Sequence, residues 1–313
     1  MYTPIADLHC DLLEYLANQP HRTADDPASQ CSIPQMKKGG VVFQVLAIYV
    51  ETQKGASVEG AKQFSLFKKL VKERSEEPIT LALAIENGSV LLDEEEKLEL
   101  GFQRLEKMRE EGGSILYISL THNTENRFAG GNESKVGLKR DGEVLLEYLH
   151  GKNIAIDFSH TSDKLAHDIF NYLDRKKLNV QPLASHSNFR KVFDTARNLP
   201  DDIALELVRR KGVIGLNFIR FFIGEHMSDI LKHIEHAVAL GIEKNLCLGA
   251  DFAADVDIPP KYSHLKSFFF PGFDNSSCYP QFLQLLREKF SEDFIQRLAH
   301  KNLEYFLQKY QVR

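Results

Sequence analysis

The chain contains no tryptophan, and only 4 of its 313 residues are cysteine. The cysteines stand far apart, at positions 10, 31, 247 and 278, and no two of them form a Cys-x-x-Cys pair. This spacing excludes a disulfide scaffold, so we expect reduced thiols in a cytoplasmic protein. The first residues also lack the cationic and apolar regions of a secretory signal, so no export signal is expected.

Long apolar runs are missing as well. The longest, Val41–Val50, is interrupted by Gln44, whereas a helix that spans a membrane needs about 18 or more apolar residues in succession. Its length suits a buried strand better. We therefore expect no membrane anchor.

An excess of one charge is absent too, because 39 basic residues face 44 acidic ones and the net charge is −5. Such a balance provides no field that would attract nucleic acid, and we expect no nucleic-acid partner. The glycine pairs Gly39-Gly40 and Gly130-Gly131 do not open a phosphate-binding loop, and no Gly-x-Ser-x-Gly elbow occurs.

Hydrophobic residues are plentiful, at 43% of the chain, which is enough to form a buried core. Short apolar segments alternate with amphipathic ones of helical periodicity, which are expected over residues 58–74, 96–111, 163–177, 204–211 and 227–240. Several of the short segments are apolar throughout, as in a parallel sheet covered by helices. The predicted strands are Ile5–His9, Val41–Val50, Ile79–Glu86, Ser114–Thr121, Asn153–Ser159, Val180–Ser185, Gly212–Phe218 and Leu246–Phe252.

Eight strands at roughly even spacing indicate repeated βα units. Length alone fits either two domains or one barrel, and an open doubly wound sheet is the alternative architecture. No linker rich in glycine, serine or proline divides the chain. We therefore predict an α/β fold, a single (β/α)8 TIM barrel over residues 1–313. A loop is expected over 268–279 and a C-terminal helical extension over about 279–313, with an amphipathic helix at 291–310.

Polar residues recur at the C-terminal ends of these strands, which is the face where barrels of this kind carry their active sites. Four histidines and three carboxylates fall there. Imidazole nitrogens combined with carboxylate oxygens suit Zn²⁺, with Mn²⁺, Co²⁺ or Fe²⁺ as possible substitutes. In chain order the candidates are His9, Asp11, Glu86, His122, His160, His186, Asn217 and Asp251.

Each candidate has a structural alternative when it is taken alone. Glu86 could cap a helix or join a salt bridge, and a single buried histidine is more often structural than a ligand. Arg197 could bind an anionic substrate group, or it could pair with Asp201 or Asp202 at the start of a helix. The recurrence of polar residues in phase with the strand ends favours the metal site.

Three other features are expected to have structural roles only. The acidic run Asp93–Glu99 reads as a solvated helix start. Phe268–Phe270 is expected to pack within a loop. His233 and His236 lie away from the strand ends and are expected at the surface.

Taken in order, the strand-end segments resemble the renal (membrane) dipeptidase family, which comprises zinc-dependent dipeptidases among the amidohydrolase-like metal barrels. The resemblance extends from about residue 5 to residue 307. It is carried by Asp7-Leu8-His9-Cys10-Asp11-Leu12, Ile85-Glu86-Asn87-Gly88, Leu120-Thr121-His122-Asn123, Asp157-Phe158-Ser159-His160, Ser185-His186-Ser187, Arg197-Asn198-Leu199-Pro200-Asp201-Asp202 and Gly249-Ala250-Asp251-Phe252.

The resemblance implies two zinc ions per chain. His9 and Asp11 would hold one ion, His160 and His186 would hold the other, and Glu86 would bridge the two. It further implies a small dipeptide substrate, tolerance of a D-residue at the C-terminal position, and a homodimer.

The implied reaction is hydrolysis of the dipeptide amide bond by a hydroxide that bridges the two metal ions. His122 would stabilise the oxyanion that forms, and Asp251 would carry a proton to the leaving amine. Arg197 would hold the free carboxylate of the substrate. Asn217 is expected to contribute to the same substrate site.

Two departures from the family pattern fall near the expected substrate. Ile219 stands where an aromatic residue is frequent, and Ala253-Ala254 stands where Asp-Gly is common. Two other functions also stay open. One is hydrolysis of a cyclic amide, a lactone or an N-acyl amino acid at the same metals, and the other is a non-catalytic metal-binding barrel.

Overall fold

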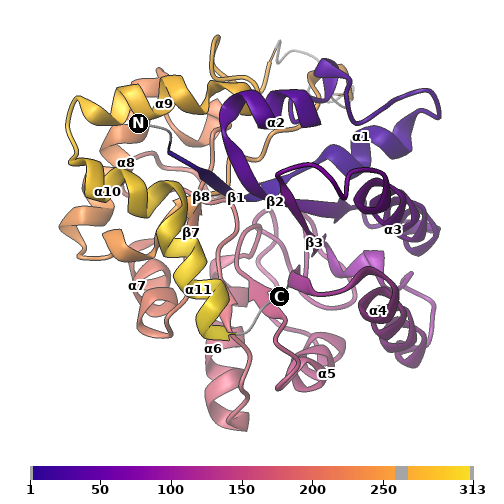
Figure 1. The fold of residues 1–313 in the computed structure, drawn as a ribbon. Helices are drawn as coiled ribbons and strands as arrows, with labels where there is room; N and C mark the ends of the chain where they lie inside the picture. The colour runs from indigo at the N-terminus through magenta and orange to yellow at the C-terminus, as the bar shows by residue number, and fades with distance from the viewer. Residues whose placement is uncertain (1–2, 258–266, 311–313) are drawn as a thin grey trace.

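The computed structural model describes residues 3–257 and 267–310. Its eight parallel strands form one sheet in the order β6-β5-β4-β3-β2-β1-β8-β7. Figure 1 shows β7, β8, β1, β2 and β3 of this series in succession. The two edges meet where Ala184, directly after β6, pairs with Ile214 in β7, and the predicted (β/α)8 barrel is confirmed. The strands are β1 (Ile5–Cys10), β2 (Val41–Tyr49), β3 (Thr80–Glu86), β4 (Ile115–Ser119), β5 (Ala155–Asp157), β6 (Pro182–Leu183), β7 (Ile214–Leu216) and β8 (Leu246–Leu248).

Several strands end earlier than the sequence predicts. The chain turns away from the ladder soon after β5 and β8, where His160 and Asp251 have φ angles of 64° and 65°. These values lie in the left-handed region that residues other than glycine seldom adopt. Such backbone strain is typical of functional sites, where the surrounding structure holds it in place. The irregular strand ends thus belong to the site itself.

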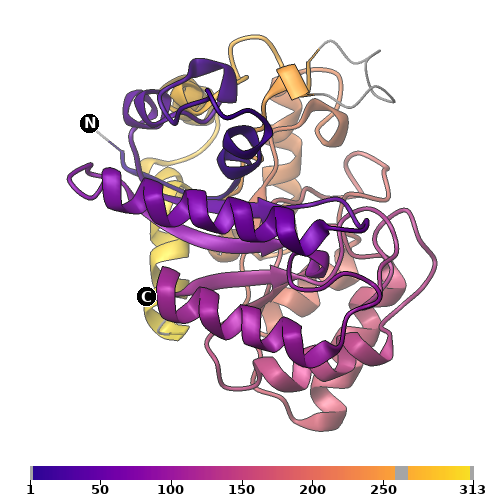
Figure 2. The same cartoon turned by 90° about the vertical axis from the view of Figure 1, so that its right-hand side faces the viewer.

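Helices cover the outside of the sheet, and α3 (Ala56–Glu73) and α4 (Leu98–Gly112) lie side by side across the strands (Figure 2). Local chemistry sets the helix ends. For example, α6 (Asp163–Lys176) begins where the Ser162 side chain accepts the N–H of Leu165. Segments for which no helix was predicted form α1, α2 and α5. The other helices of the barrel wall are α1 (Leu12–Asn18), α2 (Ile33–Gly39), α5 (Arg140–Leu149), α7 (Asp201–Arg209) and α8 (Ile230–Ala239).

The acidic run Asp93–Glu99 leads into α4 and exposes Glu94, Glu95 and Glu99, as expected of a solvated helix start, but Asp93 and Glu96 make further contacts. The Asp93 carboxylate accepts the backbone N–H groups of Gly55 at 2.6 Å and Ser57 at 2.9 Å. Glu96 forms two contacts with the Arg104 guanidinium, one of them at 2.7 Å. These carboxylates therefore anchor the loop before α3 and the start of α4.

His233 is not at the surface, contrary to the expectation. It is fully buried, its Nδ1 accepts the N–H of Phe189 at 3.1 Å, and its Nε2 lies 3.0 Å from the carbonyl oxygen of Ile223. Burial lowers its pKa to about 4. The inward face of α8 carries Ile230, Ile234 and Ala237, and position 233 falls on that stripe. Helical periodicity could have identified it.

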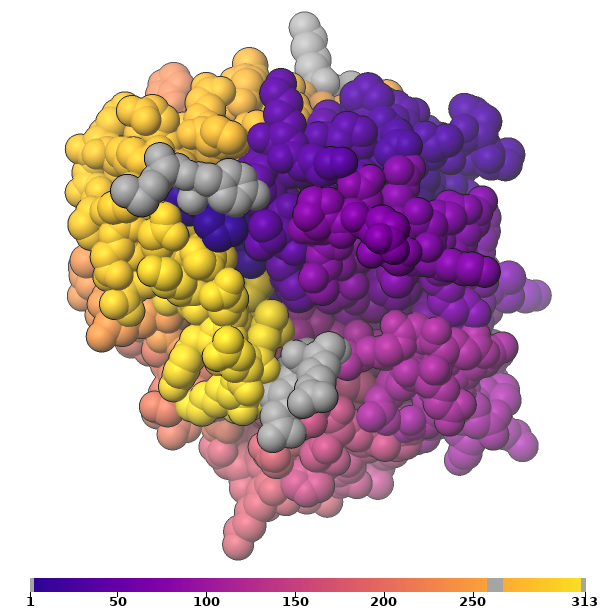
Figure 3. All heavy atoms as spheres, in the orientation of Figure 1, coloured from indigo at the N-terminus to yellow at the C-terminus, as the bar shows by residue number. Residues whose placement is uncertain are grey.

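The C-terminal segment closes the barrel at the N-terminal ends of the strands. Leu303 and Phe306 of α11 (Asn302–Tyr310) pack with inward-facing strand residues such as Leu8. Asn302 Nδ2 donates to the carbonyl oxygen of Leu246, the first residue of β8, at 2.7 Å. Figure 3 shows this segment, in yellow, lying against the indigo N-terminal part. It consists of α9 (Tyr279–Arg287), α10 (Glu292–Gln296), a π-helical turn (Arg297–Lys301) and α11.

One side chain of this segment reaches the strands that carry the candidate site. The Tyr279 hydroxyl donates to the carboxylate of Asp7 in β1. The same carboxylate accepts the N–H of His9 at 2.8 Å and that of Ala250 at 3.3 Å. Asp7 is fully buried, so these donors compensate the loss of water around its charge. Nowhere in residues 3–257 and 267–310 is a helix both long and apolar enough to cross a membrane.

Candidate metal centre

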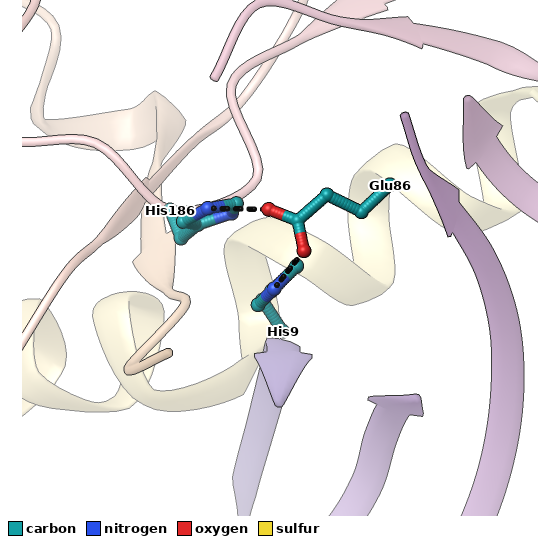
Figure 4. A group of neighbouring side chains, drawn as sticks. All are labelled: His9, Glu86 and His186. Atoms are coloured by element: carbon teal, nitrogen blue, oxygen red, sulfur yellow. Dashed lines mark ion pairs between the residues drawn. The ribbon is translucent and has the colours of Figure 1, made fainter. Parts of the chain in front are cut away.

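Three buried histidines meet at the mouth of the barrel around the carboxylate of Glu86, the last residue of β3. One oxygen of Glu86 lies 3.0 Å from His160 Nε2 and 3.3 Å from His186 Nε2. The other oxygen lies 3.4 Å from Nε2 of His9 in β1. Figure 4 shows the two oxygens directed to different histidines, His186 and His9. A single carboxylate therefore joins both halves of the site.

Two further carboxylates surround His9. Its Nε2 lies 3.5 Å from an oxygen of Asp11 and 3.5 Å from an oxygen of Asp251. His9 Nε2 and Asp11 Oδ1 are both buried and have no hydrogen-bond partner. A buried polar atom without a partner costs free energy, and a bound cation would remove that cost for both atoms at once.

These spacings fit the geometry of a bound metal ion. A tetrahedral Zn²⁺ with bonds of about 2.0–2.1 Å separates its ligand atoms by about 3.3–3.4 Å. The contacts of Glu86 with the three histidines, at 3.0, 3.3 and 3.4 Å, lie near that value. Among residues 3–257 and 267–310, the groups that could hold an ion are His9 with Glu86 and His186, Glu86 with His122 and His160, and His9 with Asp11 and Asp251.

The charges of the centre also favour a cation. Burial disfavours the charged form of His9, yet Tyr117 and Glu86 outweigh it and raise the pKa of His9 well above its usual value. Burial raises the pKa of Asp251 to about 8, although His9 opposes the shift. Both shifts favour a bound proton in a cluster of carboxylates with little positive charge. A metal ion would supply that charge instead.

A cavity of about 500 Å³ opens onto this centre. The two departures from the family pattern face it, because Ile219, Ala253 and Ala254 are all part of its wall. Phe268 lines it as well, whereas Phe269 is buried against Phe252 with ring centroids 5.3 Å apart. The polar residues that line it include Asp11, Glu86, His122, His160, Arg197 and Asp251.

Arg197 lines this cavity and is only 5% exposed. Its Nη2 donates to the carbonyl oxygen of His186 at 3.0 Å and lies 3.0 Å from His160 Nε2, while its Nη1 donates to Ser187 Oγ at 3.0 Å. Its Nε is buried and has no partner. A free donor on a buried guanidinium that lines a cavity is suited to an anionic group.

The alternative role of Arg197 is not seen. Asp201 lies 2.7 Å from His236 Nε2, and Asp202 lies 3.2 Å from His167 Nε2. Neither aspartate pairs with Arg197 in the described part of the chain.

Asn217 occupies a different place from the one expected for a residue that binds substrate. It is fully buried and is not part of the cavity wall. Its Nδ2 donates to Asp251 Oδ2 at 2.8 Å and to the carbonyl oxygen of His186 at 3.2 Å, and its Oδ1 accepts the N–H of Ile219 at 2.6 Å. The side chain thus lies behind Asp251 and holds it.

His122 faces the cavity, as expected, with its ring centroid 4.1 Å from that of His160. Its Nδ1 lies 3.4 Å from the hydroxyl of Tyr49. Burial lowers its pKa, so the neutral imidazole, with one N–H to donate, is the favoured form.

Residues behind the histidines were not found from the sequence. Tyr117, Asn123 and Ser185 contact the histidines directly, and Asp157 accepts a hydrogen bond from Ser185. Asp157 carried a signal, because a carboxylate within an otherwise apolar strand requires partners. Tyr117 carried none, since an aromatic residue in a strand is most simply read as core.

A comparison with known families gives the class to which the protein belongs. Residues 1–311 match the family model "Membrane dipeptidase (Peptidase family M19)". The chain belongs to this family. It is therefore an enzyme, a hydrolase of the metallo-dipeptidase class, and the resemblance inferred from the strand-end motifs is confirmed.

Individual relatives agree with this assignment. The chain is 25% identical over 328 residues to an uncharacterized dipeptidase of Schizosaccharomyces pombe, covering 91% of this chain and 75% of that protein. Among solved structures, a metallopeptidase of Rhodobacter sphaeroides liganded with a phosphinate mimic of the dipeptide L-Ala-D-Ala has a TM-score of 0.81 at 18% identity, over 99% of this chain and 100% of that one. The family M19 metallopeptidase "dipeptidase AC" has a TM-score of 0.82 at 18% identity, over the full length of both chains. At this identity the two structures show the shared fold.

Proposed function

We propose that the enzyme hydrolyses the amide bond of short dipeptides at a centre that holds two zinc ions. The observation that carries the proposal is the position of Glu86 between His9 on one side and His160 with His186 on the other. We assign His9 and Asp11 to one ion, His160 and His186 to the second, and Glu86 to both. The two ions would supply an activated water molecule and polarise the scissile carbonyl group.

Asp251 is assigned to proton transfer. It faces the cavity beside His9, and Asn217 fixes one of its oxygens from behind. Burial raises its pKa to about 8, and cations bound beside it would lower that pKa again. A carboxyl group whose pKa lies near the working pH can both accept a proton from water and return it to the leaving amine.

Arg197 and His122 are assigned to the substrate. The unpartnered Nε of Arg197 can donate to the free carboxylate at the C-terminal end of a dipeptide. Longer peptides carry no carboxylate at that position. The neutral His122 can donate its N–H to the oxygen that becomes negative in the transition state. The phosphinate mimic of L-Ala-D-Ala bound to the Rhodobacter sphaeroides relative supports a dipeptide with a D-residue at its C-terminal position.

A substrate panel tests the proposal. Purified protein with measured zinc content is assayed on L,L- and L,D-dipeptides, on the same dipeptides as C-terminal amides, and on N-acyl amino acids and lactones. We expect turnover of dipeptides with a free carboxylate and little of the amides. Preferred turnover of N-acyl amino acids or lactones would replace the dipeptide assignment. Zinc-loaded protein without any turnover would favour a non-catalytic barrel.

Two further expectations remain predictions. The four cysteines are free and buried, which suits the reduced thiols expected in the cytoplasm. The homodimer is expected from the family resemblance alone.

A further inference from the structure

Each of the three histidines of the proposed centre is contacted from behind through its Nδ1 atom. For His9 the contact is the hydroxyl of Tyr117 in β4, at 2.6 Å. The same hydroxyl lies 3.0 Å from the carbonyl oxygen of Leu8 and donates to it. A phenol has a single proton to donate. His9 Nδ1 must therefore carry the proton of its own contact with Tyr117.

His186 is likewise a donor through its Nδ1 atom. Its Nδ1 lies 2.7 Å from Ser185 Oγ, and Ser185 Oγ donates to Asp157 Oδ2 at 2.7 Å. Asp157 is fully buried and accepts three further hydrogen bonds, from Ser119 Oγ at 2.7 Å, from the N–H of Ser185 at 2.8 Å and from the N–H of Ser159 at 3.1 Å. Because the serine proton is directed to the carboxylate, His186 Nδ1 is again the donor.

His160 completes the set. Its Nδ1 lies 2.7 Å from Asn123 Oδ1, an oxygen that can only accept. In the neutral form that can bind a metal ion, all three imidazoles thus carry their proton on Nδ1 and present an unprotonated Nε2 to the centre. Nε2 of His160 and Nε2 of His186 are only 2.9 Å apart. Two lone pairs at that distance repel each other unless a cation lies between them.

We propose that Tyr117 and the Ser185–Asp157 pair are positioning residues of the metal centre, each of which fixes one histidine in the tautomer that can bind a cation. Tyr117 acts on His9 and hence on the ion assigned to His9 and Asp11. Ser185 and Asp157 act on His186 and hence on the other ion. This inference rests on the proposed two-metal site, and it assigns a separate residue to each ion.

Because each positioning residue is assigned to a different ion, measurements of metal binding test the inference without reference to activity. Metal-free protein is titrated with Zn²⁺ against a chromophoric chelator. We expect two equivalents for the wild type. Tyr117→Phe should bind one equivalent about 10- to 100-fold more weakly, which is the usual effect of losing an outer hydrogen bond to a ligand. Ser185→Ala should weaken the other equivalent by a similar factor, and the double variant should weaken both.

Matched controls remove hydroxyl groups elsewhere. Tyr148→Phe removes a hydroxyl that contacts Glu106, and Ser65→Ala removes one that donates to the carbonyl oxygen of Ala61. Both should bind two equivalents as the wild type does. Should Ser185→Ala fail to fold, Asp157→Asn tests the same link with little change in side-chain volume.

A second measurement reports the tautomer directly. In ¹⁵N spectra of histidine-labelled metal-free protein, His186 should be protonated at Nδ1 in the wild type. In Ser185→Ala a measurable fraction should shift to Nε2. A variant that lost thermal stability but kept this tautomer would show a purely structural role and would overturn the inference.

The outcomes separate the two proposals. Uptake of two equivalents by the wild type, with unchanged affinity in Tyr117→Phe and Ser185→Ala, would overturn the positioning roles and leave the metal centre intact. Equal weakening of both equivalents by either single variant would contradict the assignment of one residue to one ion. A wild type that takes up no zinc would overturn the proposed function and this inference together.

Discussion

Replacement of Glu86 by glutamine should abolish most of the stability that zinc gives the protein. A ligand at a hundredfold excess over its Kd stabilises the folded state by about 2.7 kcal/mol. Unfolding entropy is about 2.1 cal/mol/K per residue near 60 °C, which amounts to about 0.7 kcal/mol/K for a chain of this length. With free zinc at about a hundredfold excess over its Kd, each bound ion should therefore raise the thermal midpoint of the wild type by about 4 °C, and two ions by about 8 °C.

The shared position of Glu86 sets the size of the effect. Because one carboxylate lies within 3.0–3.4 Å of three histidines, its loss should weaken both ions at once. Losing an outer partner of a ligand already costs about 10- to 100-fold in affinity, so losing a direct ligand should cost at least about 100-fold. At the same zinc concentration each site would then be about half occupied, and zinc should raise the midpoint of Glu86→Gln by less than about 1 °C per ion.

A second effect is expected in the metal-free protein. Burial alone would raise the pKa of Glu86, but the charge of His9, with the rings of His160 and His186 beside the carboxylate, holds that pKa well below its usual value. Breaking a buried ion pair costs about 3–5 kcal/mol, so metal-free Glu86→Gln should melt about 4–7 °C below the metal-free wild type.

Thermal unfolding of both proteins, with and without zinc, measures both effects. Glu147→Gln is a suitable control, because Glu147 pairs with Lys176 on the outside of the barrel at 2.8 Å. It should keep the full shift on adding zinc. If Glu86→Gln kept the full shift too, Glu86 would not be a shared ligand.

Three further predictions concern catalysis and pH. Asp251→Asn should lower kcat by about 10²- to 10⁴-fold while the zinc content stays at two; steady-state rates and metal analysis check this, and loss of zinc would make Asp251 a ligand. Arg197→Gln should lower kcat/KM by about 10- to 100-fold on dipeptides with a free carboxylate, because charge-assisted hydrogen bonds contribute about 1.5–3 kcal/mol; the same loss on C-terminal amides would refute the assigned contact. Metal-free protein should lose stability as the pH rises from about 7 to 9. The raised pKa of His9 contributes stability that is fully present below its unfolded pKa of about 6.5 and is lost as the pH rises above it, and the raised pKa of Asp251, about 8, contributes stability that is lost between about pH 4 and 8. The lowered pKa values of His122, His160 and His186 act in the opposite direction, but only below about pH 6.5. Thermal midpoints from about pH 7 to 9 measure this, and a metal-free midpoint that rises with pH over that range would contradict it.

The strand ends could be predicted from the sequence because two patterns coincide there. Continuous apolar segments such as Ala82–Ile85 indicate buried parallel strands, and polar residues that follow them in phase indicate one shared face. These two patterns are enough to predict that His9, Glu86, His160 and Asp251 lie together. Strand lengths could not be predicted as well, because the left-handed backbone of His160 and Asp251 is imposed by the assembled site and not by local preference.

The roles of the residues behind the ligands could not be predicted from the sequence. Asn217 stands at a strand end like the others, yet its amide is directed to Asp251, which depends on how far β7 extends relative to β8. Tyr117 reads as core from its strand, and only the assembled barrel brings its hydroxyl to His9. Such roles depend on contacts between strands distant in sequence, which no local pattern encodes.

The hydrogen bond between Tyr279 and Asp7 joins residues that lie 272 positions apart. Substitutions of these two residues should therefore be coupled during evolution. A lineage that replaced Tyr279 by phenylalanine would leave a buried carboxylate short of a donor, directly beneath the backbone of His9. Natural selection should then favour a neutral residue at position 7. In sequences that descend from this gene, substitutions at positions 7 and 279 should therefore occur together.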